Sequence, residues 1–329
     1  MRAMVTVGRM FLMIVLVGLA RVPHVVAQTG EIPVDPLILP IVVKIDTFSE
    51  LEKKPITGTG FLVSREVKFG LEAKRITFLV TNKHMVSDWT LADGTVKDFN
   101  KYLQVHFYRT DSSPEHPTQS LRIDLVDEKG RLNENKIQIH SSPLIDVAVV
   151  FVQDDLTKTS GINAPSFDVS FLLPFDKITS QYVNIGTQVF VMGYPLGITS
   201  LRNNYPLAKF GYLASTPGEE FAIEIGASDR KKAEKKVKLT GKLLVIDGLI
   251  MPGNSGGPVV LPSVVRSRIN SESKRLEFMS EPSKNLVIGI LASGLGPSGL
   301  SCTYASDYVV DTINEYLKKH EYQATSSWP

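Results

Sequence analysis

Short apolar runs broken by turn residues constrain this chain more than any other feature of its sequence. Val, Ile, Leu and Phe gather in brief segments, and Gly, Pro, Asn and Asp separate them. Six runs precede a looser stretch near residues 157–180, and six follow it. Such runs and spacings are typical of β-strands, and no sustained helical periodicity appears before the C-terminal end. The pattern predicts an all-β protein in two halves. The runs are LILPIVVKIDTF, GTGFLVS, ITFLVTN, LQVHFY, LRIDLVD, DVAVVFVQ, QVFVMGYP, FGYLAST, EFAIEIG, KLLVIDG, GPVVLPS and LVIGILASG.

The C-terminal segment DYVVDTINEYLKKH has a different period. Its apolar residues recur at helical intervals, and Asp307 can cap the first turn. We therefore expect one closing helix over about residues 307–320. No repeat with a period of 20–50 residues is visible, which argues against a propeller or a solenoid. The apolar residues of the helical face are Tyr308, Val309, Ile313 and Leu317.

The first 27 residues are typical of a secretory signal peptide. Arg2 and Arg9 lead into an apolar run over residues 10–20, and Val25 and Ala27 form a cleavage-like pair. The run is too short for a good transmembrane helix, although an uncleaved anchor is an alternative. We expect cleavage after residue 27, export to the periplasm or the medium, and no stable membrane span afterwards.

Charge and cysteine content exclude several classes of protein. The signal contains three arginines, and removing them from 36 basic residues leaves 33 against 34 acidic ones. This balance does not indicate a nucleic-acid partner. Cys302 is the only cysteine, so neither an intrachain disulfide nor a cysteine cluster for zinc can form. The exported domain must therefore be stabilised by its hydrophobic core.

The sequence GNSGGP places Ser255 inside a glycine-rich loop between two strand-like runs. Glycine adopts positive φ readily and Asn254 tolerates it, so the loop can aim successive N–H groups into one space. A nucleophilic serine needs such donors, because each stabilises the oxyanion of acyl transfer by about 3 kcal/mol. We assign this oxyanion hole to the N–H groups of Gly253 and Ser255. An ordinary glycine turn is the alternative.

A serine nucleophile needs a base, and His84 has the most suitable position among the histidines. It follows the run ITFLVTN, where the apolar residues stop and a polar turn begins. The ring is therefore expected at a strand end, where it could reach a cleft. For His106, His116, His140 and His320, which lack such punctuation, we expect surface or structural roles.

Asp146 is the candidate that would orient the histidine. It stands directly before the run VAVVFV, where a carboxylate is costly unless hydrogen bonds hold it. A carboxylate fixes the tautomer of a catalytic histidine and stabilises its imidazolium form. A turn aspartate before a strand is the alternative for this residue alone. This alternative is less favoured because His84, Asp146 and Ser255 occur together.

The segments GTGFLVS, VTNKHMV, DVAVV and GNSGGPVV, in that order, resemble the chymotrypsin/trypsin-like serine endopeptidases. The likeness is strongest to the disulfide-free bacterial branch that includes the HtrA (DegP-like) proteases, and it covers about residues 40–319. It implies two six-stranded antiparallel β-barrels, with His84 and Asp146 from the first and Ser255 from the second. An α/β-hydrolase would instead run in the order Ser, Asp, His.

The resemblance and the strand pattern together suggest an N-terminal barrel over about 38–153, a linker over about 154–185 and a C-terminal barrel over about 186–305. No PDZ domain is expected after Lys319. The implied activity is hydrolysis of proteins or peptides through an acyl-enzyme, without a metal or an organic cofactor. Two alternatives stay open, namely an inactive homologue that serves as a binding module and a hydrolase of esters or of a cell-wall-linked substrate.

By resemblance, the specificity pocket has its floor near Leu249 and its walls at Ala292, Ser293, Gly294 and near Cys302. Because Leu249 is not acidic, a small or medium apolar residue is expected before the scissile bond, rather than Lys or Arg.

Three further features concern regulation and the surface. Digestive members of the family carry an aspartate at the position of Asn254, which pairs with a new N-terminal ammonium. Asparagine has no charge, so activation through the N-terminus is not expected. The lysine-rich residues 230–242 are interpreted as a solvated hairpin or loop that would attract acidic substrates if it borders the cleft. Residues 262–285 are predicted to form a polar hairpin between two strands.

Overall fold

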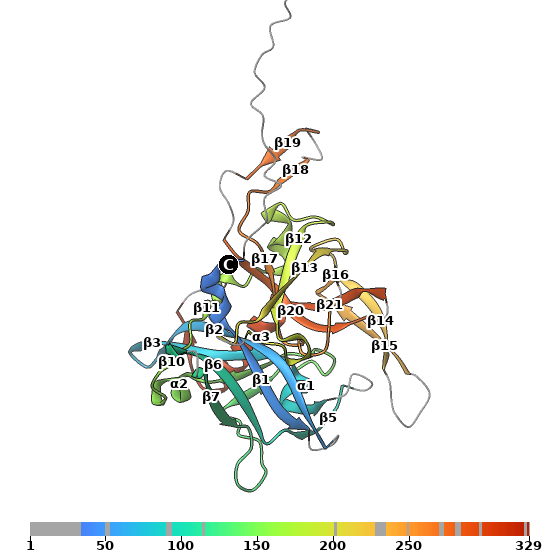
Figure 1. The fold of residues 1–329 in the computed structure, drawn as a ribbon. Coiled ribbons are helices and arrows are strands. Elements are labelled where there is room, and N and C mark those ends of the chain that lie inside the picture. The colour runs from blue at the N-terminus through green and yellow to red at the C-terminus, as the bar shows by residue number, and fades with distance from the viewer. Residues whose placement is uncertain are drawn as a thin grey trace, which may run out of the picture. The chain divides into compact units, whose positions relative to one another are not determined.

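Two β systems and a C-terminal helix make up the described part of the chain (Figure 1). This computed structural model describes residues 34–49, 53–89, 94–113, 116–200, 203–227, 235–248, 250–269, 273–279, 284–295, 298–325 and 328. The predicted signal peptide over residues 1–27 therefore lies outside the described residues. Within them, no helix is both long enough and apolar enough to cross a membrane.

The N-terminal half forms a ten-stranded sheet. Its strands are β1 (Val42–Ser49), β2 (Lys54–Phe69), β3 (Glu72–Thr81), β6 (Tyr102–Ser113), β7 (His116–Asp124), β8 (Ile137–Ile139), β9 (Ala148–Phe151), β10 (Ile162–Asn163), β11 (Phe167–Asp168) and β22 (Gln323–Ala324). The strand order is β10-β6-β1-β2-β3-β9-β8, with β7 beside β6 and with β11 and β22 beside β2. The pairs along β1, β2 and β3 are antiparallel.

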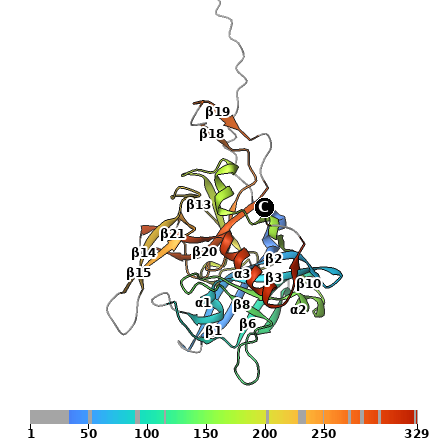
Figure 2. The same ribbon diagram turned by 180° about the vertical axis from the view of Figure 1, so that it is seen from behind.

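This sheet differs from the predicted first barrel, because its described strands do not close into a six-stranded ring. The end strands β10 and β8 contain only two and three residues, too few for an extended ladder. The helix α3 (Ser306–Lys319) packs instead against β8 and β9, and Figure 2 shows it from behind. The run at residues 37–48 also begins differently, as the 3₁₀ helix η1 (Pro36–Ile41), where Pro40 lacks an N–H for strand pairing.

The C-terminal half closes into a six-stranded barrel, as predicted. Its strands are β12 (Gln188–Gly193), β13 (Leu207–Leu213), β16 (Leu243–Asp247), β17 (Pro258–Leu261), β20 (Leu286–Gly294) and β21 (Leu300–Ala305), in the order β12-β13-β16-β21-β20-β17. The set of strands that form this barrel differs from the expected set at two places. Strand β21 was missed because its buried Ser301 and Thr303 hide the apolar pattern. Strand β14 (Phe221–Ala227) pairs with β15 (Lys235–Gly241) in a separate hairpin.

The remaining elements connect or extend these two systems. They are α1 (Lys83–Val86), β4 (Ser87–Trp89), β5 (Val96–Phe99), α2 (Gln153–Lys158), η2 (Val169–Phe171), η3 (Phe175–Gln181), η4 (Pro195–Gly197), β18 (Ser267–Ile269) and β19 (Leu276–Phe278). Strands β18 and β19 pair, which confirms the hairpin predicted within residues 262–285. Of the lysine-rich segment, residues 230–234 lie outside the described part, and Lys238 on β15 is exposed.

Strand β12 joins the two hydrophobic cores through its alternation. Val189 and Val191 belong to the core inside the barrel, whereas Phe190 and Met192 belong to the core that also contains the sheet residues. Successive side chains of a strand point to opposite faces, so one strand serves both cores. The N-terminal sheet and the C-terminal barrel are therefore packed together through β12. The loop that follows β3 belongs to the sheet, and the loop that precedes β17 belongs to the barrel.

Candidate active site

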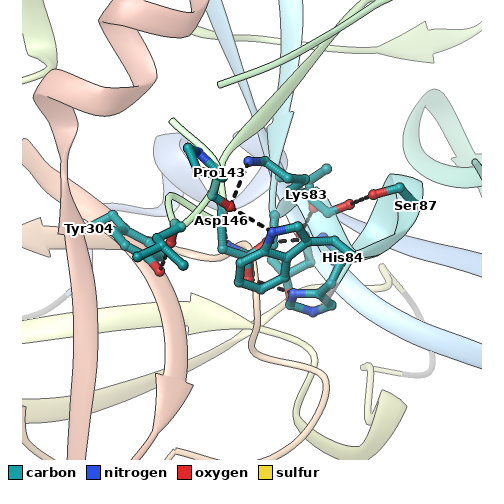
Figure 3. Close-up of polar contacts among 11 residues, drawn as sticks. Lys83, His84, Ser87, Pro143, Asp146 and Tyr304 are labelled. Carbon is teal, nitrogen blue, oxygen red and sulfur yellow. Dashed lines mark hydrogen bonds and ion pairs between the residues drawn. The ribbon is translucent and has the colours of Figure 1, made fainter. Parts of the chain in front are cut away.

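His84 and Asp146 lie side by side although one follows strand β3 and the other precedes strand β9. Strand β3 ends at Thr81, and His84 follows in the short helix α1. Its Nδ1 lies 2.7 Å from Asp146 Oδ2, and its backbone N–H donates to Asp146 Oδ1 at 3.0 Å (Figure 3). Both carboxylate oxygens thus hold one residue. A carboxylate at Nδ1 favours the tautomer whose Nε2 is free to accept a proton.

The two side chains differ in exposure, and their contact changes the pKa of His84. The His84 side chain is 31% exposed, so a substrate can reach it, whereas that of Asp146 is only 5% exposed. Burial lowers the pKa of His84, but the charge of Asp146 and its hydrogen bond raise it, and the net pKa lies above the usual 6.5. The buried carboxylate therefore stabilises the protonated ring.

Other groups hold the segment that carries Asp146. The Asn82 side chain donates to the Asp146 carbonyl at 2.7 Å. Tyr304, from the barrel strand β21, donates through its hydroxyl to the Leu144 carbonyl at 3.0 Å. Burial raises the pKa of the Tyr304 hydroxyl, and the nearby charge of Asp146 adds to this. The hydroxyl therefore stays protonated and remains a hydrogen-bond donor. In Figure 3, Asp146 lies between Tyr304 on one side and Lys83 and His84 on the other.

The loop around Ser255 uses glycines that no other residue can replace. Gly253 has φ +98° and Gly256 has φ +85°, both in the region that favours glycine. A Cβ on Gly253 would lie 2.2 Å from the Tyr194 carbonyl oxygen, and one on Gly256 would lie 2.1 Å from the Thr59 carbonyl oxygen. The tight turns expected from GNSGGP are therefore present, and they pack directly on neighbouring backbone.

Two threonines connect this loop to the strand that leads to His84. The Thr59 N–H donates to the Ser255 carbonyl at 2.9 Å, and Thr59 Oγ1 donates to the Gly253 carbonyl at 2.6 Å. Thr81 Oγ1 in turn donates to the Thr59 carbonyl at 2.8 Å. Strand β2 thus bridges the loop and the end of β3. Sequence analysis missed both threonines, although each lies inside a quoted motif, GTGFLVS and VTNKHMV.

No hydrogen bond joins Ser255 to His84 in the described part of the chain. Among the described residues, the hydroxyl of Ser255 has no hydrogen-bond partner, and its side chain is partly exposed. Catalytic hydrogen bonds are often long without substrate and shorten when it binds. The structure therefore pairs His84 with Asp146 and ties the Ser255 loop nearby through Thr59 and Thr81.

The backbone N–H groups of the loop fall into two sets. The Asn254 N–H donates to the Met251 carbonyl at 3.2 Å, and the Gly257 N–H donates to the Asn254 carbonyl at 2.9 Å. In the described part of the chain, the N–H groups of Gly253 and Ser255 donate to no backbone carbonyl. These two donors are the pair assigned to the oxyanion hole, and that assignment stays a prediction.

The residues expected to form the specificity pocket come together only in part. Strands β20 and β21 pair Ser293 with Cys302 and Gly294 with Ser301. Ala292 is buried on β20, and Cys302 is buried with its thiol pKa raised to about 12 by burial. Leu249, the expected floor, lies outside the described residues. The pocket assignment stays a prediction.

A second serine, histidine and aspartate lie in contact on the N-terminal sheet. Ser120 Oγ lies 2.9 Å from His106 Nδ1, and His106 Nε2 lies 2.8 Å from Asp46 Oδ2. The three side chains come from β7, β6 and β1, and Lys44 also pairs with Asp46 at 3.0 Å. We call this set the Ser120 array. No positive-φ glycine occurs in the described chain between Gly94 and Gly130, so Ser120 lacks a loop like that of Ser255.

Gly256→Ala is expected to lower the free energy of unfolding by about 3 kcal/mol or more, because left-handed strain and a backbone clash add. Gly130→Ala is the matched control, since Gly130 has φ +75° but nothing within 4 Å of an added Cβ. It should cost only about 1 kcal/mol from strain. Urea unfolding followed by circular dichroism measures both values. Equal losses would contradict the close packing of Gly256 on Thr59.

Comparison with known proteins adds a family to this geometry. The profile of the trypsin-like peptidase domain matches residues 58–263, a range that includes His84, Asp146 and Ser255. The chain belongs to the trypsin-like peptidase domain family. None of the curated proteins matches this trypsin-like peptidase.

Among solved structures, this chain is similar to the active form of the Rv3671c protease from M. tuberculosis, with 16% identity, a TM-score of 0.45 and coverage of 92% of this chain and 93% of that one. It is also similar to Deg5, with 17% identity, a TM-score of 0.40 and coverage of 85% and 89%. The MamO protease domain from Magnetospirillum magneticum gives 16% identity, a TM-score of 0.42 and coverage of 83% and 95%.

Proposed function

We propose that this trypsin-like peptidase is a serine endopeptidase, with Ser255 as nucleophile, His84 as general base and Asp146 as the residue that orients the base. The two contacts of His84 with Asp146 carry this proposal, because the one at Nδ1 favours the tautomer that a base requires and the backbone N–H bond holds the residue in place. The free N–H groups of Gly253 and Ser255 support it. The substrates are proteins or peptides.

The proposed reaction is acyl transfer in two stages. Ser255 Oγ attacks the carbonyl carbon of the scissile bond, and its proton moves to His84 Nε2. The developing oxyanion accepts hydrogen bonds from the N–H groups of Gly253 and Ser255. His84 then gives the proton to the leaving amine, and a water molecule hydrolyses the acyl-enzyme by the same route. Asp146 stabilises the imidazolium form in both stages.

The Ser120 array is a less suitable nucleophilic centre. Its histidine binds a carboxylate that also pairs with Lys44, so the negative charge is shared with a fixed cation. Burial raises the pKa of Asp46, but its hydrogen bonds to His106, Thr57 and Lys44 hold it well below the usual range. Without a glycine loop beside Ser120, no matching oxyanion donors are evident. We therefore assign the reaction to Ser255.

Within the family, we propose the HtrA (DegP-like) type, exported to the periplasm or the medium. A single cysteine and the uncharged Asn254 support this assignment. The Ser255 loop does not need a buried ammonium for order, because other contacts hold it. Besides Thr59, the Leu196 N–H donates to the Pro252 carbonyl at 2.7 Å.

A fluorophosphonate probe and casein together test the proposal on the purified protein. We expect covalent labelling that peptide mapping locates at Ser255, with none at Ser120, and we expect degradation of casein. Absence of labelling would instead favour a binding module. Labelling with ester turnover but intact casein would favour an esterase.

The specificity proposal gives a separate prediction. Since Leu249, the residue expected at the pocket floor, is not acidic, cleavage should follow Val, Ala or Leu. In an apolar pocket, one extra or missing methylene changes kcat/KM by about 10-fold to 200-fold. A graded preference among Val, Ala and Leu is therefore expected. A peptide library analysed by mass spectrometry gives the profile. A profile dominated by Lys and Arg would contradict the pocket assignment.

A further inference from the structure

Lys83, the residue before His84, is buried with a relative exposure of 1%. Its Nζ donates to the Ser142 carbonyl at 3.0 Å and reaches the Pro143 carbonyl at 3.5 Å (Figure 3). The ammonium also lies 5.8 Å from the ring centre of Trp89. A lysine is almost never fully buried without partners, because removing its charge from water is costly. Hydrogen bonds compensate for the burial of this ammonium, so its position has to be explained by the groups that it binds.

The two carbonyls that Lys83 binds belong to the turn that leads into Asp146. The Ile145 N–H donates to the Ser142 carbonyl at 3.3 Å, which closes this turn. Trp89 Nε1 donates to the Pro143 carbonyl at 2.9 Å, so the same oxygen has a neutral donor as well. The ammonium thus binds the turn only a few residues before the carboxylate that holds His84.

Three successive residues at the start of α1 hold the segment that carries Asp146. Asn82 binds the Asp146 carbonyl, Lys83 binds the turn before it, and the His84 N–H binds its carboxylate. Because these residues are adjacent, a shift of the turn relative to α1 would move Asp146 relative to the imidazole. Displacement of a catalytic group by about 1 Å can cost about 100-fold in rate.

We propose that Lys83 is a positioning residue for the His84–Asp146 pair: its ammonium fixes the turn over residues 142–146. The effect on turnover rests on the proposed function. The effect on the geometry of His84 does not, because it follows from the hydrogen bonds alone.

The charged groups around Lys83 determine how its role depends on pH. Burial lowers the pKa of Lys83 to about 8, while the charges of Asp146 and of Glu315 on α3 oppose this. The charge of Lys83 also acts on His140, after β8: burial lowers the pKa of His140, the charge of Glu315 opposes this, and the charge of Lys83 lowers it further. Lys83 is charged below pH about 8 and neutral above it. The charge that strengthens the hydrogen bonds of Lys83 to the turn is therefore present at neutral pH and lost as the pH rises past about 8.

Lys83→Met tests the proposal because it keeps an apolar stem and removes the ammonium. Both carbonyls keep another donor, Ile145 N–H and Trp89 Nε1, so the variant is expected to fold. We expect kcat to fall about tenfold with KM changed less than twofold, and the loss to shrink above pH about 8. Lys83→Arg, which keeps charge and donors, should recover most of kcat. Lys177→Met removes an exposed lysine and should match the parent.

Proton NMR of His84 gives a readout that does not need activity. The Nδ1 proton, held by Asp146, should exchange with water at least tenfold faster in Lys83→Met than in the parent. If the parent shows no peptidase activity but exchange is still faster in Lys83→Met, the proposed function fails while this inference is supported. Parent-like exchange and parent-like kcat in a folded variant would overturn it. If Lys83→Met does not fold, Lys83→Gln replaces it, with the same expected and contrary results.

Discussion

Ser255→Ala and His84→Ala are each expected to lower kcat for peptide hydrolysis by about a millionfold, with little change in KM. The nucleophile and its base act as one unit, so removing either leaves only substrate binding and the oxyanion donors. The Gly253 and Ser255 N–H groups remain in both variants, and a residual rate above that of water is expected. Hydrolysis of a chromogenic peptide at saturating concentration measures kcat, and circular dichroism verifies the fold.

Ser120→Ala is the matched control for this prediction. It removes a serine hydroxyl that is hydrogen-bonded to a histidine, as the mechanism requires, but from the Ser120 array. Because Ser120 is exposed, its truncation is expected to leave kcat within about twofold of the parent. A large loss in Ser120→Ala together with full activity in Ser255→Ala would assign the nucleophile to the other array.

Local sequence was informative wherever backbone conformation or residue chemistry decides the structure. The glycines of GNSGGP were expected to adopt tight turns, and Gly253 and Gly256 do adopt positive φ against neighbouring carbonyls. His84 was expected at a strand end, and it follows β3 directly. In each case the reason lies within a few residues, so a single sequence is enough to state it.

Contacts between distant segments were not predictable in the same way. Thr59 and Gly253 are 194 positions apart, and only the packing of β2 on the barrel loop brings them together. Sequence analysis made no prediction for the buried Lys83, whose carbonyl partners lie 59 and 60 positions away. Strand closure is equally nonlocal, since a run such as EFAIEIG fits a barrel strand or a hairpin such as β14 equally well.

Asp146→Asn should lower kcat by about four orders of magnitude, because an amide can favour the wrong tautomer of His84. It should also move the acid limb of kcat/KM. In the parent, Asp146 raises the pKa of His84 above 6.5, so the neutral base is lost as the pH falls through that raised value. Without the charge, burial alone acts and lowers the pKa. The acid limb of the variant should therefore lie at lower pH than that of the parent.

The matched control is Asp46→Asn, which removes a carboxylate from a second His–Asp contact in the described part of the chain, that with His106. It should leave both kcat and the acid limb near those of the parent, apart from any loss of folded protein. Profiles of kcat/KM between about pH 5 and 9 distinguish the two variants. An acid limb that stays in place in Asp146→Asn, with kcat reduced, would mean that His84 is not the titrating base. A shift in Asp46→Asn instead would assign the limb to His106.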